Sequence, residues 1–193
     1  MRYAHNLKFQ YISCLFWLCQ YDIFHFVPLS GTISYAKLAA ATRVPEQRLK
    51  SIVRMAMTNT LFREQPDGKH VGHSATSALL ARNGDMYAYA AYMCAKSAPT
   101  AMNMAAAHQK WGPGSMRTNE TAYNVAFDTD LPFFDHISQD EAKMAEFAGY
   151  MQSVRSSDGV DLKHLVASYE WQDICESGVV VDVSAFNFHA LTS

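Results

Sequence analysis

One stretch of the chain combines an acid–base side chain with apolar and aromatic neighbours. In residues 93–111, "MCAKSAPTAMNMAAAHQKW", His108 is the side chain whose ordinary pKa lies near neutral pH. Methionine and aromatic side chains adapt to flat rings, so such a stretch can line a pocket for an aromatic ligand. A lone histidine beside apolar residues is more often structural than catalytic, so both interpretations stay open.

The spacing of histidines and cysteines does not indicate a metal site. The eight histidines form no HExxH pattern, and His70 and His73 lie in a predicted hairpin, where solvated strand residues are expected. The cysteines show no CxxC pair and no metal-ligand spacing. Reduced thiols in a cytoplasmic protein are therefore predicted. The four cysteines are Cys14, Cys19, Cys94 and Cys175.

The charge balance argues against a nucleic-acid partner. The formal net charge is -2, so no overall field attracts a polyanion. Charged residues make up 18% of the chain, below the roughly 25% of typical globular proteins, which indicates a surface partly buried in an oligomer. A helix in the first half carries a few basic side chains, too few for a recognition helix. They are Arg48, Lys50 and Arg54, against Glu46, with Lys69 and His70 in the following hairpin.

The apolar segment at residues 6–29 is not expected to span a membrane. A spanning helix needs about 20 nearly unbroken apolar residues. Here polar side chains interrupt the run, so we expect a helix that is covered by protein, with another subunit as the candidate cover. The interrupting residues are Lys8, Gln10, Gln20, Asp22 and His25.

The first 80 residues show the order of a winged-helix module. A helix over 6–26 is expected to end before Pro28, a second helix over 35–42 follows an N-cap serine, and a third begins at Pro45. Pro66-Asp67-Gly68 then predicts a hairpin turn between two short strands.

Helical pattern dominates the rest of the chain. We expect helices over 74–111 with a break before Pro99, irregular or short-helical structure over 119–138, and an amphipathic helix from Ser138. A short helix is expected near 160–168. The predicted fold class is therefore mainly α, with a small β-hairpin wing.

Six segments of the chain stand out together and in order: "WLCQYDIFHFVPL", "GTISYAKLAAATRVPEQRLKSIVRMAMTNTLF", "HSATSALLA", "NETAYNVAFDTDLPFFDHIS", "MQSVRSSDGVDLKHLV" and "YEWQDI" followed by "GVVVDV". They resemble fungal secondary-metabolite O-methyltransferases of the sterigmatocystin 8-O-methyltransferase type. The resemblance covers about residues 11–183.

In that family a winged-helix, helical dimerisation half precedes a Rossmann-like half that binds S-adenosylmethionine. The resemblance implies the dimerisation half and only the first strand of the second, Val179–Val183. Ser184, Ala185 and Phe186 stand where the family has a glycine-rich turn that lets the cofactor approach the backbone. We therefore expect no complete Rossmann domain and no S-adenosylmethionine site. An unspliced intron and a gene shortened in evolution both stay open as origins of this ending.

The resemblance also implies a pocket. In the family, the helix that corresponds to residues 93–111 contributes apolar walls to an aromatic-substrate site. Among the residues that could line such a pocket, His108 is the candidate catalytic residue, because it is the one with acid–base capability near neutral pH. The implied substrate-binding residues are Met102, Asn103, Trp111, Phe127, Phe133 and Phe134.

Two functions compete at this point. The first is a detached dimerisation or auxiliary domain, a homodimer or a partner of a full-length methyltransferase or another pathway enzyme. The second is a cofactor-independent enzyme, such as a pericyclase, cyclase, dehydratase or isomerase, acting on a small aromatic or polyketide-like ligand. The predicted segments are 1–30 (dimerisation helix), 31–80 (winged helix), 81–175 (helical dimerisation and lid region) and 176–193 (strand remnant and divergent tail).

Overall fold

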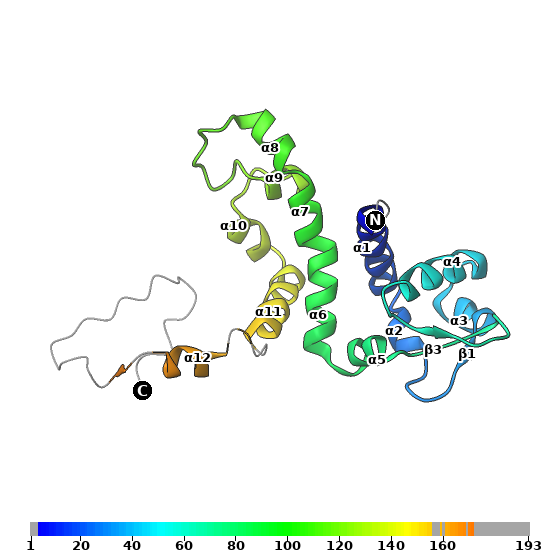
Figure 1. Cartoon of the computed structure of the whole chain (residues 1–193). Helices are drawn as coiled ribbons and strands as arrows, with labels where there is room; N and C mark the ends of the chain where they lie inside the picture. The colour runs from blue at the N-terminus through cyan, green and yellow to red at the C-terminus, as the bar shows by residue number, and fades with distance from the viewer. Residues whose placement is uncertain (1–3, 156–158, 160, 169, 172–193) are drawn as a thin grey trace. The chain divides into compact units, whose positions relative to one another are not determined.

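The computed structural model describes residues 4–155, 159, 161–168, 170 and 171. The chain divides into two compact units, Met1–Ser156 and Ser157–Ser193. In the first unit, short strands alternate with helices up to β3, and helices follow (Figure 1). Its elements are α1 (Ala4–Gln20), α2 (Ile23–Phe26), β1 (Ile33–Ser34), α3 (Tyr35–Thr42), α4 (Glu46–Met57), β2 (Arg63–Glu64), β3 (His70–Gly72), α5 (Ala75–Arg82), α6 (Gly84–Tyr92), the π-helix η1 (Met93–Ser97), α7 (Ala98–Met102), α8 (Met104–Trp111), α9 (Ala122–Phe127), α10 (Phe133–Ser138) and α11 (Glu141–Arg155).

The winged-helix prediction is confirmed. The Ser34 hydroxyl accepts the Lys37 N–H and caps α3, and Pro45 occupies the N-cap position of α4. The strands form one antiparallel sheet in the order β1-β3-β2, with Ile33 opposite Val71. A Cβ at Gly72 would lie 2.8 Å from the Gly31 carbonyl oxygen, so only glycine lets the two backbones approach this closely.

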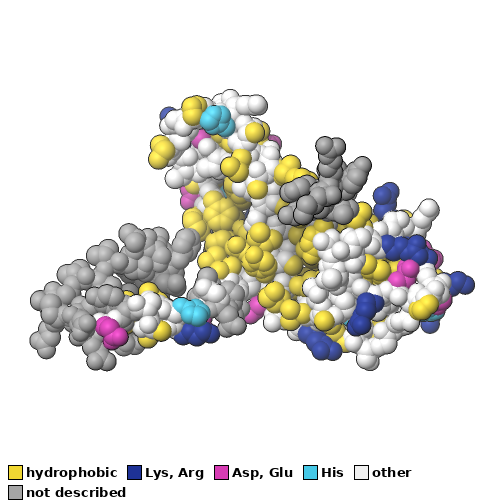
Figure 2. All heavy atoms as spheres, viewed as in Figure 1, with side chains coloured by type: hydrophobic (Ala, Val, Ile, Leu, Met, Phe, Trp, Pro, Cys, Tyr) yellow, Lys and Arg dark blue, Asp and Glu magenta, His cyan; other side chains and the backbone are white. Residues whose placement is uncertain are grey.

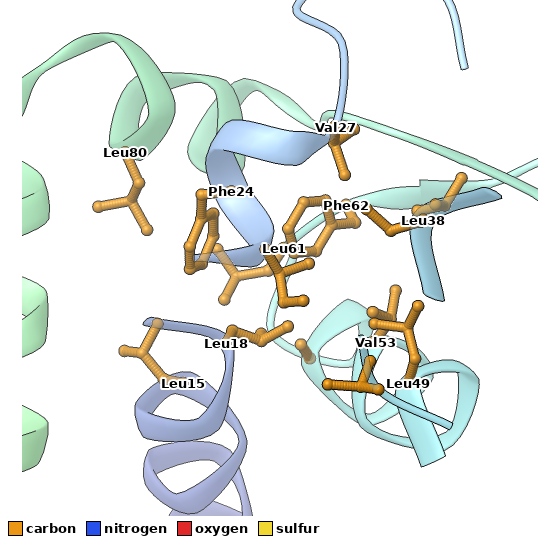
Figure 3. Close-up of a cluster of buried hydrophobic side chains, with 14 of the residues drawn as sticks. Leu15, Leu18, Phe24, Val27, Leu38, Leu49, Val53, Leu61, Phe62 and Leu80 are labelled. Atoms are coloured by element: carbon orange, nitrogen blue, oxygen red, sulfur yellow. The ribbon is translucent and has the colours of Figure 1, made fainter. Parts of the chain in front are cut away.

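The core of the module lies where the end of α1 meets α2, α3, α4 and the wing. Figure 3 shows Phe24 and Phe62 beside Leu61 at its centre, and the two rings stack with centroids 5.1 Å apart. Nine apolar side chains of this core are fully buried. Each Leu, Ile, Val or Phe among them contributes about 1.5 to 3 kcal/mol to stability by leaving water. The fully buried members are Leu18, Ile23, Phe24, Leu38, Leu49, Val53, Ala56, Leu61 and Val71.

The prediction of a single helix over residues 6–26 was wrong in one respect: the chain turns between α1, which ends at Gln20, and α2, which begins at Ile23. Asp22 adopts a left-handed conformation with φ 54° and begins α2. The Tyr87 hydroxyl lies 3.0 Å from the Cys19 carbonyl oxygen and 3.3 Å from Asp22 Oδ1, and so binds the turn from α6. A tertiary contact of this kind has no local sequence signature.

The break expected before Pro99 is also absent, and a π-helix stands in its place. Proline lacks an N–H and its ring clashes with the carbonyl four residues back. The helix widens accordingly: the Ala98 N–H bonds to the Met93 carbonyl, five residues back. The Thr100 hydroxyl donates to the Lys96 carbonyl at 2.8 Å. The helical path thus continues from α6 through η1 into α7.

Helix α11 packs along α6 through close backbone approach and aromatic stacking. Gly149 faces Ala88, where an added Cβ would lie 3.6 Å from that side chain. The rings of Tyr92 and Tyr150 stack at 4.3 Å between centroids. In Figure 2 hydrophobic side chains gather over this part of the viewed face.

The second unit contains α12 (Leu162–Ala167), whose N-cap is Asp161. The Asp161 carboxylate accepts the Lys163 N–H at 2.9 Å. The predicted strand Val179–Val183 and the tail lie outside the described residues. In the part of the chain that is described, the only sheet is the three-stranded wing, so the mainly α fold class is confirmed and no complete Rossmann domain is present there. The predicted segment boundaries remain predictions.

Among the described residues, no helix has both the length and the apolar character required to cross a bilayer.

His73 predicts a specific pH dependence of stability. Its buried ring joins the Val27 carbonyl (3.1 Å from Nε2) to the Ser77 hydroxyl (2.9 Å from Nδ1), and burial lowers its pKa. Because the unfolded ring titrates near about 6.5 and the folded ring lower, the unfolded state binds more protons as pH falls through that window. The free energy of unfolding should therefore fall from pH 7.5 to 5.

The measurement is the urea-unfolding midpoint at both pH values for the native chain and His73→Gln. The variant should lose part of the decrease and keep the part due to His136, whose pKa is also lowered. An identical decrease in both proteins would contradict the assignment.

Candidate functional site

The continuous helical path α6–η1–α7 is called the long helix below. A cavity of about 170 Å³ lies between this long helix and the three helices α9, α10 and α11. Its walls come from α6, η1, α9, α10 and α11, all within the first unit (Figure 1). Aromatic and charged side chains share the lining. They are Tyr92, Lys96, Tyr123, Phe127, His136, Ile137, Lys143 and Glu146.

The π-helix supplies one cation to this cavity. Lys96 belongs to η1, so the widened turn that accommodates Pro99 also sets the direction of its side chain. The Lys96 ammonium lies 3.2 Å from the Glu146 carboxylate and 5.6 Å from the centroid of the Phe127 ring. The pair lies at the solvent edge, because the Glu146 side chain is 56% exposed.

A buried asparagine holds the opposite wall. The Asn124 amide donates to the carbonyls of Thr129 and Leu131, both at 2.8 Å, and its oxygen accepts the Thr121 hydroxyl at 2.7 Å. These bonds close the loop between α9 and α10. The loop therefore determines how Tyr123 and His136 face one another.

Three polar side chains form a chain across the cavity. The Tyr123 hydroxyl lies 2.9 Å from His136 Nδ1, and the Lys143 ammonium lies 3.0 Å from His136 Nε2. An ammonium can only donate, so Nε2 accepts and the ring proton sits on Nδ1, where it is donated to the Tyr123 oxygen. The Tyr123 O–H is then directed elsewhere.

The protonation states agree with this assignment. Partial burial lowers the pKa of His136, and the Lys143 and Lys96 charges lower it further, so its imidazole is neutral at pH 7. Burial raises the pKa of Tyr123, which keeps its proton. The Tyr123 phenol and the Lys143 ammonium therefore offer hydrogen-bond donors suited to an anion, whereas the Lys96 ammonium is paired with Glu146.

The residues predicted from the sequence are only partly brought together. Phe127 lines the cavity, whereas Met102, Asn103, His108 and Trp111 do not. Met102 is 66% exposed, and His108 is also exposed, on α8. The Asn103 amide donates to the Pro99 carbonyl in its own helical path, and Lys110 lies 4.6 Å from the Trp111 ring centroid. A catalytic role for His108 stays a prediction.

Phe133 and Phe134 belong to an aromatic cluster beside the cavity. Their rings pack edge-to-face, 5.0 Å apart, and both contact Phe147 of α11 at 5.2 and 5.9 Å. Phe133 also packs edge-to-face on Tyr123 at 5.0 Å. These contacts fasten α10 to α11, and substrate binding by the two residues remains a prediction.

The grouping of Lys96, Tyr123, His136 and Lys143 was not predicted from the sequence. One signal was available, since Lys96 is the single charged side chain in the apolar run 86–107. The remaining three come from separate helices, so their spacing along the chain carries no motif.

A second feature is a groove of about 500 Å³ between α1, α5 and the long helix. All but two of its lining residues are apolar or aromatic, and Ile12, Tyr89 and Met93 are more than one-third exposed. The lining residues are Tyr11, Ile12, Leu15, Leu61, Thr76, Leu80, Tyr89, Ala90, Met93, Cys94, Ser97, Ala98 and Ala101.

No group of three or more potential metal ligands occurs within the described ranges.

The first part of the chain matches a known family model. Residues 1–83 match the model described as the O-methyltransferase dimerisation domain, and this range contains α1 through α5. Residues 1–83 are therefore similar to an O-methyltransferase dimerisation domain. The winged helix and the α1 and α5 walls of the groove lie within this matched range.

The relatives of the chain are fungal O-methyltransferases. O-methyltransferase pgmB of Aspergillus terreus is 64% identical over 178 residues, which are 92% of this chain and 50% of that protein. O-methyltransferase aoiF of Aspergillus oryzae is 45% identical over 97% of this chain and 44% of its own length. The chain spans about half the length of the curated relatives it matches, and the recognition from the sequence is confirmed for that N-terminal half.

Among solved structures, OxaC in complex with sinefungin and meleagrin superposes with a TM-score of 0.71 at 13% identity, over 89% of this chain and 42% of that one. At this identity the match shows a common fold and nothing about ligands.

Asn124→Ala should destabilise the chain by about 2 to 4 kcal/mol, because it removes three hydrogen bonds and leaves two carbonyls without their donor. Urea unfolding at fixed protein concentration measures this. Asn119→Ala is the matched control: its amide donates to Asp130 in the same loop but at the exposed surface, at 2.9 Å. Equal losses in both variants would mean that Asn124 is not the residue that holds the loop.

Proposed function

We propose that this chain acts by self-association, as the dimerisation module of a fungal O-methyltransferase-like protein. The apolar groove between α1, α5 and the long helix carries the proposal. Its α1 and α5 walls lie inside the matched dimerisation domain, so a second copy of the chain is the occupant that the groove fits best. Exposed apolar patches of this kind mark interaction sites.

We also propose that the chain binds no S-adenosylmethionine by itself. Dinucleotide-type and related cofactor sites form at the carboxyl ends of parallel strands, beside a glycine-rich turn. The described strands have two or three residues each and are antiparallel. Homodimerisation is the favoured state, and pairing with a full-length methyltransferase would use the same groove.

The cofactor-independent enzyme stays the second candidate. The chain superposes on a structure titled "A Pericyclic Reaction enzyme" with a TM-score of 0.64 at 16% identity, over 76% of this chain and 38% of that one. A common fold does not carry an activity. The exposure of His108 favours the first proposal over a reaction centred on that residue.

Met93→Asp should raise the dimer dissociation constant at least about tenfold, because it removes a methionine from the groove and places a charge there. Sedimentation equilibrium at micromolar concentration measures the constant. Met116→Asp is the matched control, since Met116 is 94% exposed and does not line the groove. A native chain that is monomeric, or equal effects of both substitutions, would refute the proposed surface.

Calorimetric titration of the purified chain with S-adenosylmethionine should give no binding heat up to millimolar concentration. S-adenosylhomocysteine, tested in parallel, should behave the same way. Saturable micromolar binding of either compound would overturn the proposed absence of a cofactor site, while leaving the dimer proposal intact.

A further inference from the structure

We propose that the cavity between η1, α9, α10 and α11 binds the carboxylate of a small, single-ring aromatic acid. The carboxylate would lie by Lys143 and the Tyr123 hydroxyl, with the ring against Tyr92 and Phe127. The other lining cation, Lys96, is already paired with Glu146 at 3.2 Å. This proposal is independent of self-association, because every lining residue lies in one copy of the chain.

The charge distribution is the first argument. Lys143 lines the cavity, and within the part of the chain that is described it forms no ion pair. Its ammonium contacts the neutral ring of His136 instead. A partly buried cation without a counter-ion is unfavourable, and an anionic ligand supplies the missing charge.

The direction of the donors is the second argument. Lys143 uses one N–H for His136 and keeps two, and Tyr123 accepts from His136 and keeps its own O–H. His136 thereby holds the two donors on either side of one imidazole ring. A carboxylate, with two oxygens and several lone pairs, can accept a hydrogen bond from either donor.

The size and walls of the cavity select the rest of the ligand. A cavity of about 150 Å³ lined by apolar side chains is known to bind benzene, so about 170 Å³ has room for one aromatic ring. The Tyr92 and Phe127 rings and Ile137 supply the apolar lining. Among acidic aromatic compounds, a carboxylic acid is ionised at pH 7, whereas a phenol with a pKa near about 10 is neutral.

The test is titration of the chain with benzoate, followed by ¹H–¹⁵N NMR shifts, beside two matched ligands. Benzamide has the same shape without the charge, and phenol has the ring with a neutral hydroxyl. Benzoate should bind at least tenfold more tightly than either. Equal binding of benzoate and benzamide would overturn the proposal, and tighter binding of phenol would overturn the choice of carboxylate.

Substitutions of the lining residues test which side chains contact benzoate. Lys143→Met should weaken benzoate binding at least tenfold, and Tyr123→Phe about threefold to tenfold, while benzamide binding changes little. Lys110→Met is the matched control, because Lys110 lies over Trp111 and does not line the cavity. An unchanged benzoate affinity in Lys143→Met, with a native circular-dichroism spectrum, would refute the site.

His136 is a positioning residue in this scheme, and its test uses the ratio of benzoate to benzamide affinity. His136→Leu should bring the ratio near one, whereas His136→Gln, which keeps a donor and an acceptor, should restore much of it. A ratio unchanged in both variants would remove His136 from the site. Met93→Asp should bind benzoate like the native chain, so that failure of the dimer and failure of this site are distinguished.

Discussion

The packing of the long helical path α6–η1–α7 between two sets of neighbours is the constraint on which both candidate surfaces depend. One side of this path, with Ala90 and Cys94, faces α1 and forms the floor of the apolar groove. Another side, with Tyr92 and Lys96, meets α9 and α11 and forms the cavity wall. The π-turn before Pro99 alters the angular spacing of side chains along this path, and so helps to determine which residues reach each surface.

Two different kinds of contact hold the path in place. Toward the winged helix the contacts are those of an ordinary apolar core, centred on Leu18, Phe24 and Leu61. Toward α11 they are ring stacks, with Tyr150 against Tyr92 and Tyr89, and the ion pair between Lys96 and Glu146. The first kind tolerates substitution as long as volume is kept, whereas the second is sensitive to single atoms. The groove should therefore withstand sequence change better than the cavity.

The two surfaces suit different roles. The groove is apolar and open, and part of it lies in the range that matches the O-methyltransferase dimerisation domain. The cavity is small and carries charge, and its walls come entirely from the region after residue 83. A chain with both can associate through one surface and retain a separate polar pocket in each copy.

The sequence by itself determined the fold class and the winged helix. The signals there are local: Ser34 and Pro45 start helices, Leu49 and Val53 fall on one helical face, and Pro66–Gly68 makes the turn. Only the tertiary structure decided the turn at Asp22, the π-helix and the cavity. The turn at Asp22 and the cavity depend on contacts between different elements, such as Tyr87 with Asp22 or His136 with Tyr123, and no local pattern in the sequence predicts such contacts. The π-helix has a local cause in Pro99, but only the structure shows that the helix widens there and does not break. Phe127 could be proposed because the family resemblance implied it, whereas nothing in the sequence pointed to Lys143.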